Sequence, residues 1–217
     1  SSELKKVLDH YQNQPEKLKA ARFLIANIPA HRTYVGKEID SLKQMKKESI
    51  QQGRISDEIV THWKSFDYSS SQVVKDIDVI KADILIENID LAFEAWEKRS
   101  WSKQYSFEDF CEYVLPYRIG DEPLEKWRRI YYERYSPVLD SLYQGNDVVE
   151  AARVMANYLK EEGFTNHTDF NLPHLGALFL LENRVGYCRD NCDIATYVMR
   201  SLGIPITMDF YEITSFD

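Results

Sequence analysis

The segment from Val185 to Pro205 constrains the fold of this chain most, because it carries signals for both ends of a helix. Asp190 lies near the predicted start, where the helix dipole favours a negative charge. Gly203 predicts the end of the helix about four turns later, and Pro205 follows two residues on. Apolar side chains at helical spacing predict one buried stripe, made of Cys192, Ala195, Val198, Met199 and Leu202.

Cys188 lies in the first turn of this predicted helix. The first N–H groups of a helix have no partner within it, and the helix dipole places a partial positive charge there. A thiol in that position ionises more readily, and the thiolate is the nucleophilic form. The sequence therefore predicts a nucleophile at Cys188. The alternative is a buried structural thiol at a helix start.

The three cysteines predict neither a disulfide framework nor a metal site. Cys188 and Cys192 lie one turn apart on the predicted helix, a spacing at which a structural disulfide is uncommon. They also lack the further ligands that a zinc site needs. Cys111 is expected to be an inert thiol of the core. We therefore expect no metal and no cofactor.

Composition sets broad limits on what the protein can be. The chain has 217 residues, of which 44% are hydrophobic and 13% aromatic, so a packed core is expected. Its net charge is −8, and no basic stripe with interleaved aromatic residues is present, which argues against a nucleic-acid partner. No apolar run approaches 18 residues, so we expect no transmembrane segment.

Apolar residues at helical spacing run through residues 1–145, which predicts an almost entirely helical region. Within it, the lysine-rich helix at 37–52 is expected to expose its lysines to solvent. Pro137 should kink or interrupt a long helix at 124–143. The aromatic residues Trp127, Tyr131 and Tyr135 are interpreted as a packing face, with a sugar-binding platform as the alternative.

The second region, residues 146–217, contains the cysteine helix and one predicted strand. The strand runs from Ile204 to Ile213, where apolar and polar residues alternate. The expected fold class is therefore α+β and predominantly α-helical. The unpaired strand also makes a strand-mediated dimer a possible partnership.

The cysteine helix resembles the core motif of the transglutaminase-like superfamily, through the string GYCRDNCDIATYVMRSLGIP. In that alignment Cys188 is the nucleophile, and Cys192 takes the place of the family's small helix residue. The segments 85–96 and 110–118 resemble the helical N-terminal part of transglutaminase-like proteins from gut Bacteroidetes. The resemblance implies that residues 146–217 are the first part, core helix plus first strand, of a transglutaminase-like core.

The resemblance also implies a papain-like mechanism on a peptide or protein substrate, such as a cell-wall peptide. The Cys188 thiolate would attack an amide carbonyl, and water or an amine would resolve the acyl-enzyme. We expect a peptidase or amidase rather than a cross-linking enzyme. Relatives of this kind are usually exported, often as lipoproteins, which implies an extracytoplasmic protein, periplasmic or on the cell surface, whose signal has been removed.

The sequence departs from the family in its histidines. The family's base follows the core helix, whereas His10, His31, His62, His167 and His174 all precede Cys188. We therefore expect either a chain truncated before its His and Asp, which we favour, or a lineage that lost the triad.

An upstream base from the loop that holds His167 and His174 is the minority alternative. Tyr187, Asp190 and His174 are the residues expected to line the site. We expect no turnover from this chain alone. The competing class of function is a non-catalytic binding or scaffold module.

Overall fold

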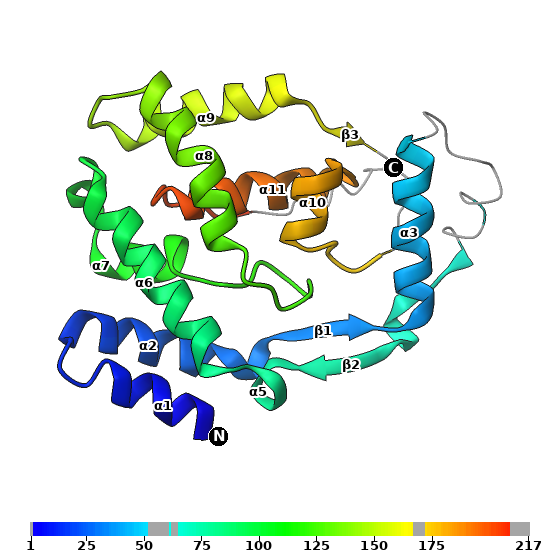
Figure 1. The fold of residues 1–217 in the computed structure, drawn as a ribbon, viewed down its shortest axis with the longest axis horizontal. Coiled ribbons are helices and arrows are strands. Elements are labelled where there is room, and N and C mark those ends of the chain that lie inside the picture. Colours follow the sequence, from blue (N-terminus) through cyan, green and yellow to red (C-terminus); the bar gives the residue numbers. More distant parts are fainter. Residues whose placement is uncertain (1, 52–60, 62–64, 167–171, 209–217) are drawn as a thin grey trace, which may run out of the picture.

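The computed structural model describes residues 2–51, 61, 65–166 and 172–208. The described chain is predominantly helical and has two small sheets of two strands each, which confirms the predicted α+β class (Figure 1). The α-helices are α1 (Ser2–His10), α2 (Pro15–Asn27), α3 (Lys37–Gln51), α5 (Asp76–Val79), α6 (Ala82–Lys98), α7 (Phe107–Asp109), α8 (Arg128–Leu142), α9 (Val148–Glu162), α10 (Ala177–Asn183) and α11 (Cys188–Ser201).

Short elements complete the chain. The 3₁₀ turns are η1 (Ile28–Ala30), η2 (Tyr68–Ser70) and η3 (Ser102–Gln104), and η4 (Phe110–Val114) is a π-helical turn. The strands are β1 (Arg32–Val35), β2 (Gln72–Lys75), β3 (Thr165–Asn166) and β4 (Val185–Gly186). No helix of the described residues is long and apolar enough to cross a membrane.

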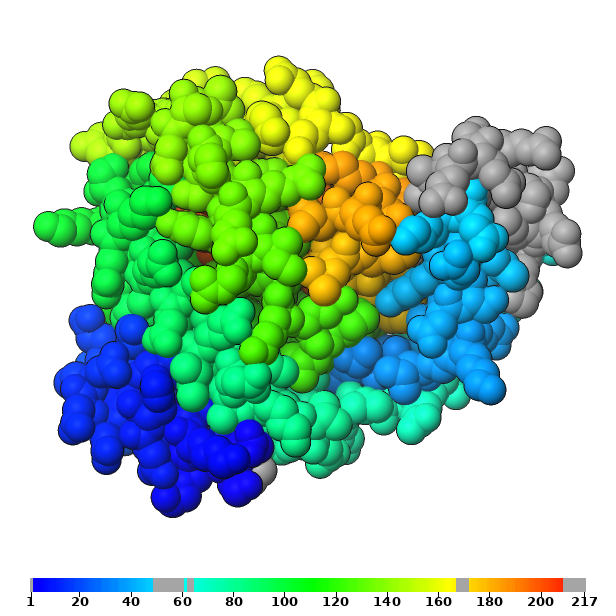
Figure 2. Space-filling view, viewed as in Figure 1, coloured from blue at the N-terminus to red at the C-terminus, as the bar shows by residue number. Residues whose placement is uncertain are grey.

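The predicted cysteine helix, α11, lies in the middle of the fold (Figure 1). It contacts α6, α8, α9, α10 and η4. From the side shown in Figure 2, α8 and α10 cover nearly all of it. The other elements are therefore arranged around this helix.

Two clusters of buried side chains form the core. One joins α1 and α2 to α6 and the α7–η4 segment; its members include Val7, Tyr11, Leu24, Leu85, Ile89, Phe93, Phe110 and Val114. The other joins α3, α8, α9, α10 and α11; its members include Leu42, Trp127, Tyr131, Tyr135, Met155, Leu180, Tyr197 and Val198. Trp127, which precedes α8, and Tyr131 and Tyr135 on α8 thus form a packing face, as expected: the Trp127 and Tyr131 rings lie 4.9 and 5.5 Å from the ring of Tyr197.

The antiparallel pair β1–β2 corrects the expectation of an almost entirely helical first region. Its register places Thr33 opposite Val74 and Tyr34 opposite Val73. Each strand has four residues and holds β-branched side chains, which favour strands. Strands of this length are too short to show the alternating pattern that identifies a strand in a sequence, and the partner strand is distant along the chain.

A buried ion pair attaches the β1–β2 sheet to the body of the molecule. Arg118 and Asp76 are both 1% exposed in their side chains, and Arg118 Nε donates to Asp76 Oδ2 over 2.8 Å. The Tyr117 hydroxyl donates to the same carboxylate over 2.9 Å. Arg118 also donates to Thr33 Oγ1 on β1 over 3.0 Å. The guanidinium therefore joins β1, the start of α5 and the segment after η4.

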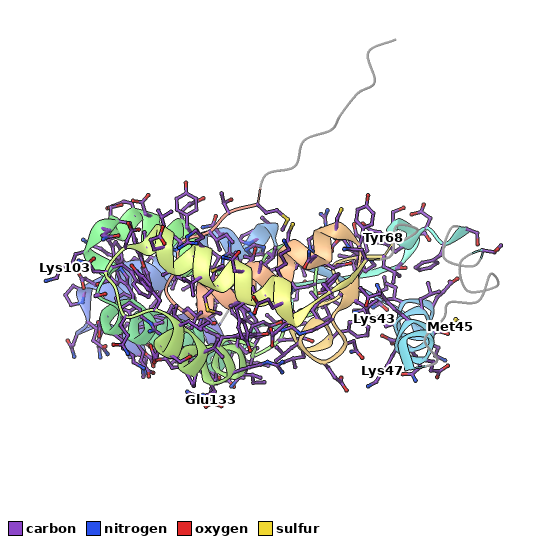
Figure 3. All side chains as sticks on the ribbon, turned by 90° about the horizontal axis from the view of Figure 1, so that it is seen from above. Lys43, Met45, Lys47, Tyr68, Lys103 and Glu133 are labelled. Carbon is purple, nitrogen blue, oxygen red and sulfur yellow. The ribbon has the colours of Figure 1, made fainter. Side chains whose placement is uncertain are left out.

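Three further expectations are corrected. α8 begins at Arg128 and continues through Pro137, which therefore does not interrupt it. Lys46 on α3 is fully buried and Lys43 partly buried, so these lysines do not form a solvated face. Figure 3 shows Lys43 on the side of α3 that faces the body of the molecule, where its Nζ donates to Leu175 O over 3.2 Å. Burial lowers the pKa of Lys46 to about 7.

The strand predicted from Ile204 to Ile213 is absent from its described part, residues 204–208, and the rest lies outside the described residues. This segment pairs with no strand among the described residues and lies against η4 instead, where Ile206 N donates to Tyr113 O over 3.4 Å.

The Asp76–Arg118 pair should dominate the stability of the β1–β2 sheet. Replacing Asp76 with Asn keeps the size of the side chain but leaves the buried guanidinium without a counter-charge, a change that typically costs about 3–5 kcal/mol. Urea unfolding followed by circular dichroism should show a loss of that size. Asp9→Asn, which removes the exposed Lys5–Asp9 pair, is the matched control and should leave the midpoint unchanged. Equal midpoints for the two variants would contradict the role given to Asp76.

Candidate functional site

A tight turn sets the start of α11. β4 pairs in parallel with β3, with Gly186 opposite Asn166. The chain then turns at Tyr187, whose N–H donates to Asp190 Oδ2 over 2.8 Å. A Cβ on Gly186 would lie 2.5 Å from Asp190 Cβ, so only glycine fits here. The glycine and the acid of the motif therefore act together to make Cys188 the first residue of the helix.

The expected site residues lie at different depths around this helix start. Cys188 is a free, exposed thiol, and the Tyr187 side chain beside it is 38% exposed. Asp190 is 1% exposed and serves the helix as a cap. The first-turn N–H groups of Cys188 and Arg189 have no acceptor within the helix, so they can face a developing negative charge.

Buried arginines fix the opposite end of α11. Arg200 on α11 donates through NH1 to Arg118 O over 2.8 Å and through Nε to Tyr113 O over 3.3 Å. Its own carbonyl accepts from NH1 of Arg128 over 2.7 Å. Gly203 then takes the left-handed conformation, with φ +71°, that the predicted helix stop requires. The arginine of the Arg-x-x-Gly-Ile-Pro string is therefore an anchor of the helix.

His174 does not contact Cys188. Its Nδ1 lies 2.7 Å from Asp193 Oδ2, and its backbone N–H donates to Asp121 Oδ1 over 2.8 Å. The edge of its ring lies against Gly120. No hydrogen bond joins Cys188 to His174 in the part of the chain that the structure describes. His167, the other upstream alternative, lies outside the described residues.

The His174–Asp193 pair is buried and coupled. Burial alone would lower the pKa of His174, but the hydrogen bond to Asp193 and the charge of that carboxylate more than offset it and raise the pKa. Asp193 is fully buried, which raises its pKa to about 6 despite the bond to His174. The pair locks the first half of α11 to the segment before α10.

Asp193 is the residue of this site that the sequence did not predict. The predicted stripe placed Cys192 in the core, but Cys192 is exposed and Asp193 is buried beside Ile194. The prediction assumed that the charged residues of an amphipathic helix point to solvent. It fails at Asp193 because His174 gives this carboxylate a hydrogen-bond partner inside the protein. The sequence held only a weak signal for this pair, namely an acidic residue next to an apolar helix position and a histidine 19 residues earlier.

An open groove of about 390 Å³ runs beside the exposed face of α11. Its lining residues are Asn191, Cys192 and Ala195 from α11, Ala156, Leu159 and Lys160 from α9, and Phe164 and Asn166 from the segment that ends in β3. Cys192 therefore faces a space that small molecules can enter. Within the described ranges, no three His, Cys, Asp or Glu side chains gather as a metal site would require.

The pH dependence of stability tests the His174–Asp193 pair. A raised pKa in the folded state means that the stabilisation from His174 is fully present below the unfolded value of about 6.5 and is lost as pH rises through the folded value. The difference in unfolding free energy between wild type and His174→Asn should therefore shrink from pH 6.5 to pH 9. Chemical unfolding at several pH values measures it.

The exposed His10 offers the matched control, because His10→Asn removes an imidazole that makes no buried ion pair among the described residues and should give only a small difference in unfolding free energy. A His174→Asn difference that is constant or that grows with pH would contradict the ion pair.

No family model, no curated protein and no solved structure matches this chain. The function proposed for it therefore rests on α11 and its surroundings.

Proposed function

We propose that the protein is a cysteine-dependent acyl transferase or hydrolase of the transglutaminase-like kind, with Cys188 as its nucleophile. The observation that carries the proposal is the exposed Cys188 thiol at the first residue of a helix of 14 residues. That position combines access for a substrate with the positive end of the helix dipole. The substrate class is a peptide or protein amide, with an extracytoplasmic peptide as the resemblance implies.

The other two thiols are poorer nucleophiles. Neighbouring residues partly desolvate the Cys192 sulfur, which raises its pKa although the residue is exposed, and the charges of Asp193 and Cys188 raise it further. Burial raises the pKa of Cys111 to about 12. Since the thiolate is the attacking form, Cys188 is the cysteine that should react.

The first half-reaction can be written from these atoms. The Cys188 sulfur adds to the carbonyl carbon, and the first-turn N–H groups of α11 stabilise the oxyanion. The C–N bond then breaks, the amine leaves with a proton, and a thioester remains on Cys188. Water resolves the thioester in a hydrolase, which we favour over cross-linking.

Proton transfer is the step that the described residues do not provide for. A positioned base contributes about 10²–10⁴-fold to such reactions, and among the described residues no hydrogen bond joins His174 to Cys188, since its Nδ1 pairs with Asp193 and its Nε2 lies against Gly120. We therefore expect activated esters to acylate the chain, because their leaving groups do not have to be protonated. We expect no turnover of amides.

A non-catalytic binding module of the same fold is the second candidate. It is favoured by the lack of any hydrogen bond between Cys188 and an imidazole among the described residues. In that case the open face of α11 would hold a peptide without cleaving it.

Reaction with p-nitrophenyl acetate separates the two candidates. Mass spectrometry of the intact chain should show one acetyl group, mapped to Cys188 by digestion at low pH, and Cys188→Ala should abolish it. Cys192→Ala, one turn further along the same helix, is the matched control and should be acetylated like the wild type. Labelling that is equal at Cys188 and Cys192, or absent from both, would overturn the nucleophile and favour the binding module.

A further inference from the structure

Two free thiols share the open face of α11. Cys188 and Cys192 are both exposed, and they are the first and fifth residues of the helix. Side chains four residues apart on a helix have Cβ atoms about 5–6 Å apart. The charge of Cys188 contributes to the raised pKa of Cys192, as expected for neighbouring sulfurs.

This spacing suits a bridging ion better than a disulfide. A disulfide needs Cβ atoms about 3.5–4.5 Å apart, so it would require the first turn of α11 to unwind. Two metal–thiolate bonds of about 2.3 Å allow the sulfurs to lie up to about 4.6 Å apart. Rotation about χ1 of each cysteine can bring the two sulfurs within this distance while the helix stays intact.

The position of Cys188 gives it the rotamer freedom that such a bridge needs. Within a helix, the g+ rotamer is rare because it clashes with the preceding turn. Cys188 is the first helical residue, so no preceding turn of α11 restricts the rotamer of its side chain. The side chain of Cys192 in turn leans toward the N-terminus, and therefore toward Cys188.

We propose that Cys188 and Cys192 form a two-coordinate dithiolate site for a single soft monovalent ion, Cu(I). Thiolates select soft ions. Zinc prefers four ligands, whereas no third His, Cys, Asp or Glu joins the two cysteines in the described parts of the chain. The groove of about 390 Å³ beside Cys192 gives the ion a path to the sulfurs.

Charge also favours this complex. Two thiols and one Cu(I) give a dithiolate complex of charge −1 and release two protons. The N-terminus of α11 stabilises negative charge, and Lys160 on the groove supplies a cation from α9. Because metal binding releases these protons, affinity should rise with pH.

Anaerobic titration of the reduced full chain with Cu(I), against a colorimetric Cu(I) chelator, tests the site. The wild type should take up one ion per chain. Cys188→Ser and Cys192→Ser should each lose this uptake, and circular dichroism should show that these exposed substitutions keep the helix. Cys111→Ser, which removes the buried thiol, is the matched control and should bind as the wild type does.

Uptake that survives in either single variant, or that depends on Cys111, would overturn the site. An ion shared by two chains, detected as a copper-dependent dimer by size-exclusion chromatography, would also overturn it. The site does not depend on the acyl-transfer proposal, since Cys192→Ser should lose copper and keep acetylation of Cys188.

Discussion

The position of α11 in the fold depends on the hydrogen bonds of Arg128, a residue that is 3% exposed. Its Nε donates to Asn88 Oδ1 over 2.8 Å, and its NH1 donates to Arg200 O over 2.7 Å. Its NH2 donates to Val114 O over 2.9 Å and also reaches the carbonyl oxygens of Leu115 and Pro116. The carbonyls at the C-terminal ends of η4 and α11 carry partial negative charge, which compensates the buried cation. One side chain therefore joins α6, α8, η4 and α11.

The consequence for function is that α11 is fixed at both ends and open along one side. Arg128 and Arg200 hold its C-terminal end, and the Asp193–His174 and Asp190–Tyr187 contacts hold its first turns. The face that carries the two exposed cysteines takes no part in these contacts. A rigid helix with an open N-terminal face suits chemistry that needs a positioned thiol. Both proposals, acyl transfer and dithiolate ligation, use that face.

Local signals allowed the helix to be predicted, and long-range partners decided the rest. Asp190, Gly203 and Pro205 act within a few residues of themselves, so the bounds of α11 could be read from the sequence. The burial of Asp193 could not, because it depends on His174, which an intervening helix and strand separate from α11. The β1–β2 pair and the carbonyl partners of Arg128 depend on contacts that no periodicity encodes. The role of Cys188 could be proposed from sequence because position in a helix, rather than a distant partner, gives it its chemistry.

Hydrogen–deuterium exchange of α11 in wild type and Arg128→Met tests the central claim most directly, because it measures whether the arginine anchors that helix. In the wild type, the amides of residues 197–202 should exchange as slowly as the best-protected amides of the core. In the variant, these amides and those of residues 113–115 should exchange faster relative to the amides of α2, to which Arg128 makes no hydrogen bond. Unchanged protection of α11 relative to α2 in the variant would contradict the account.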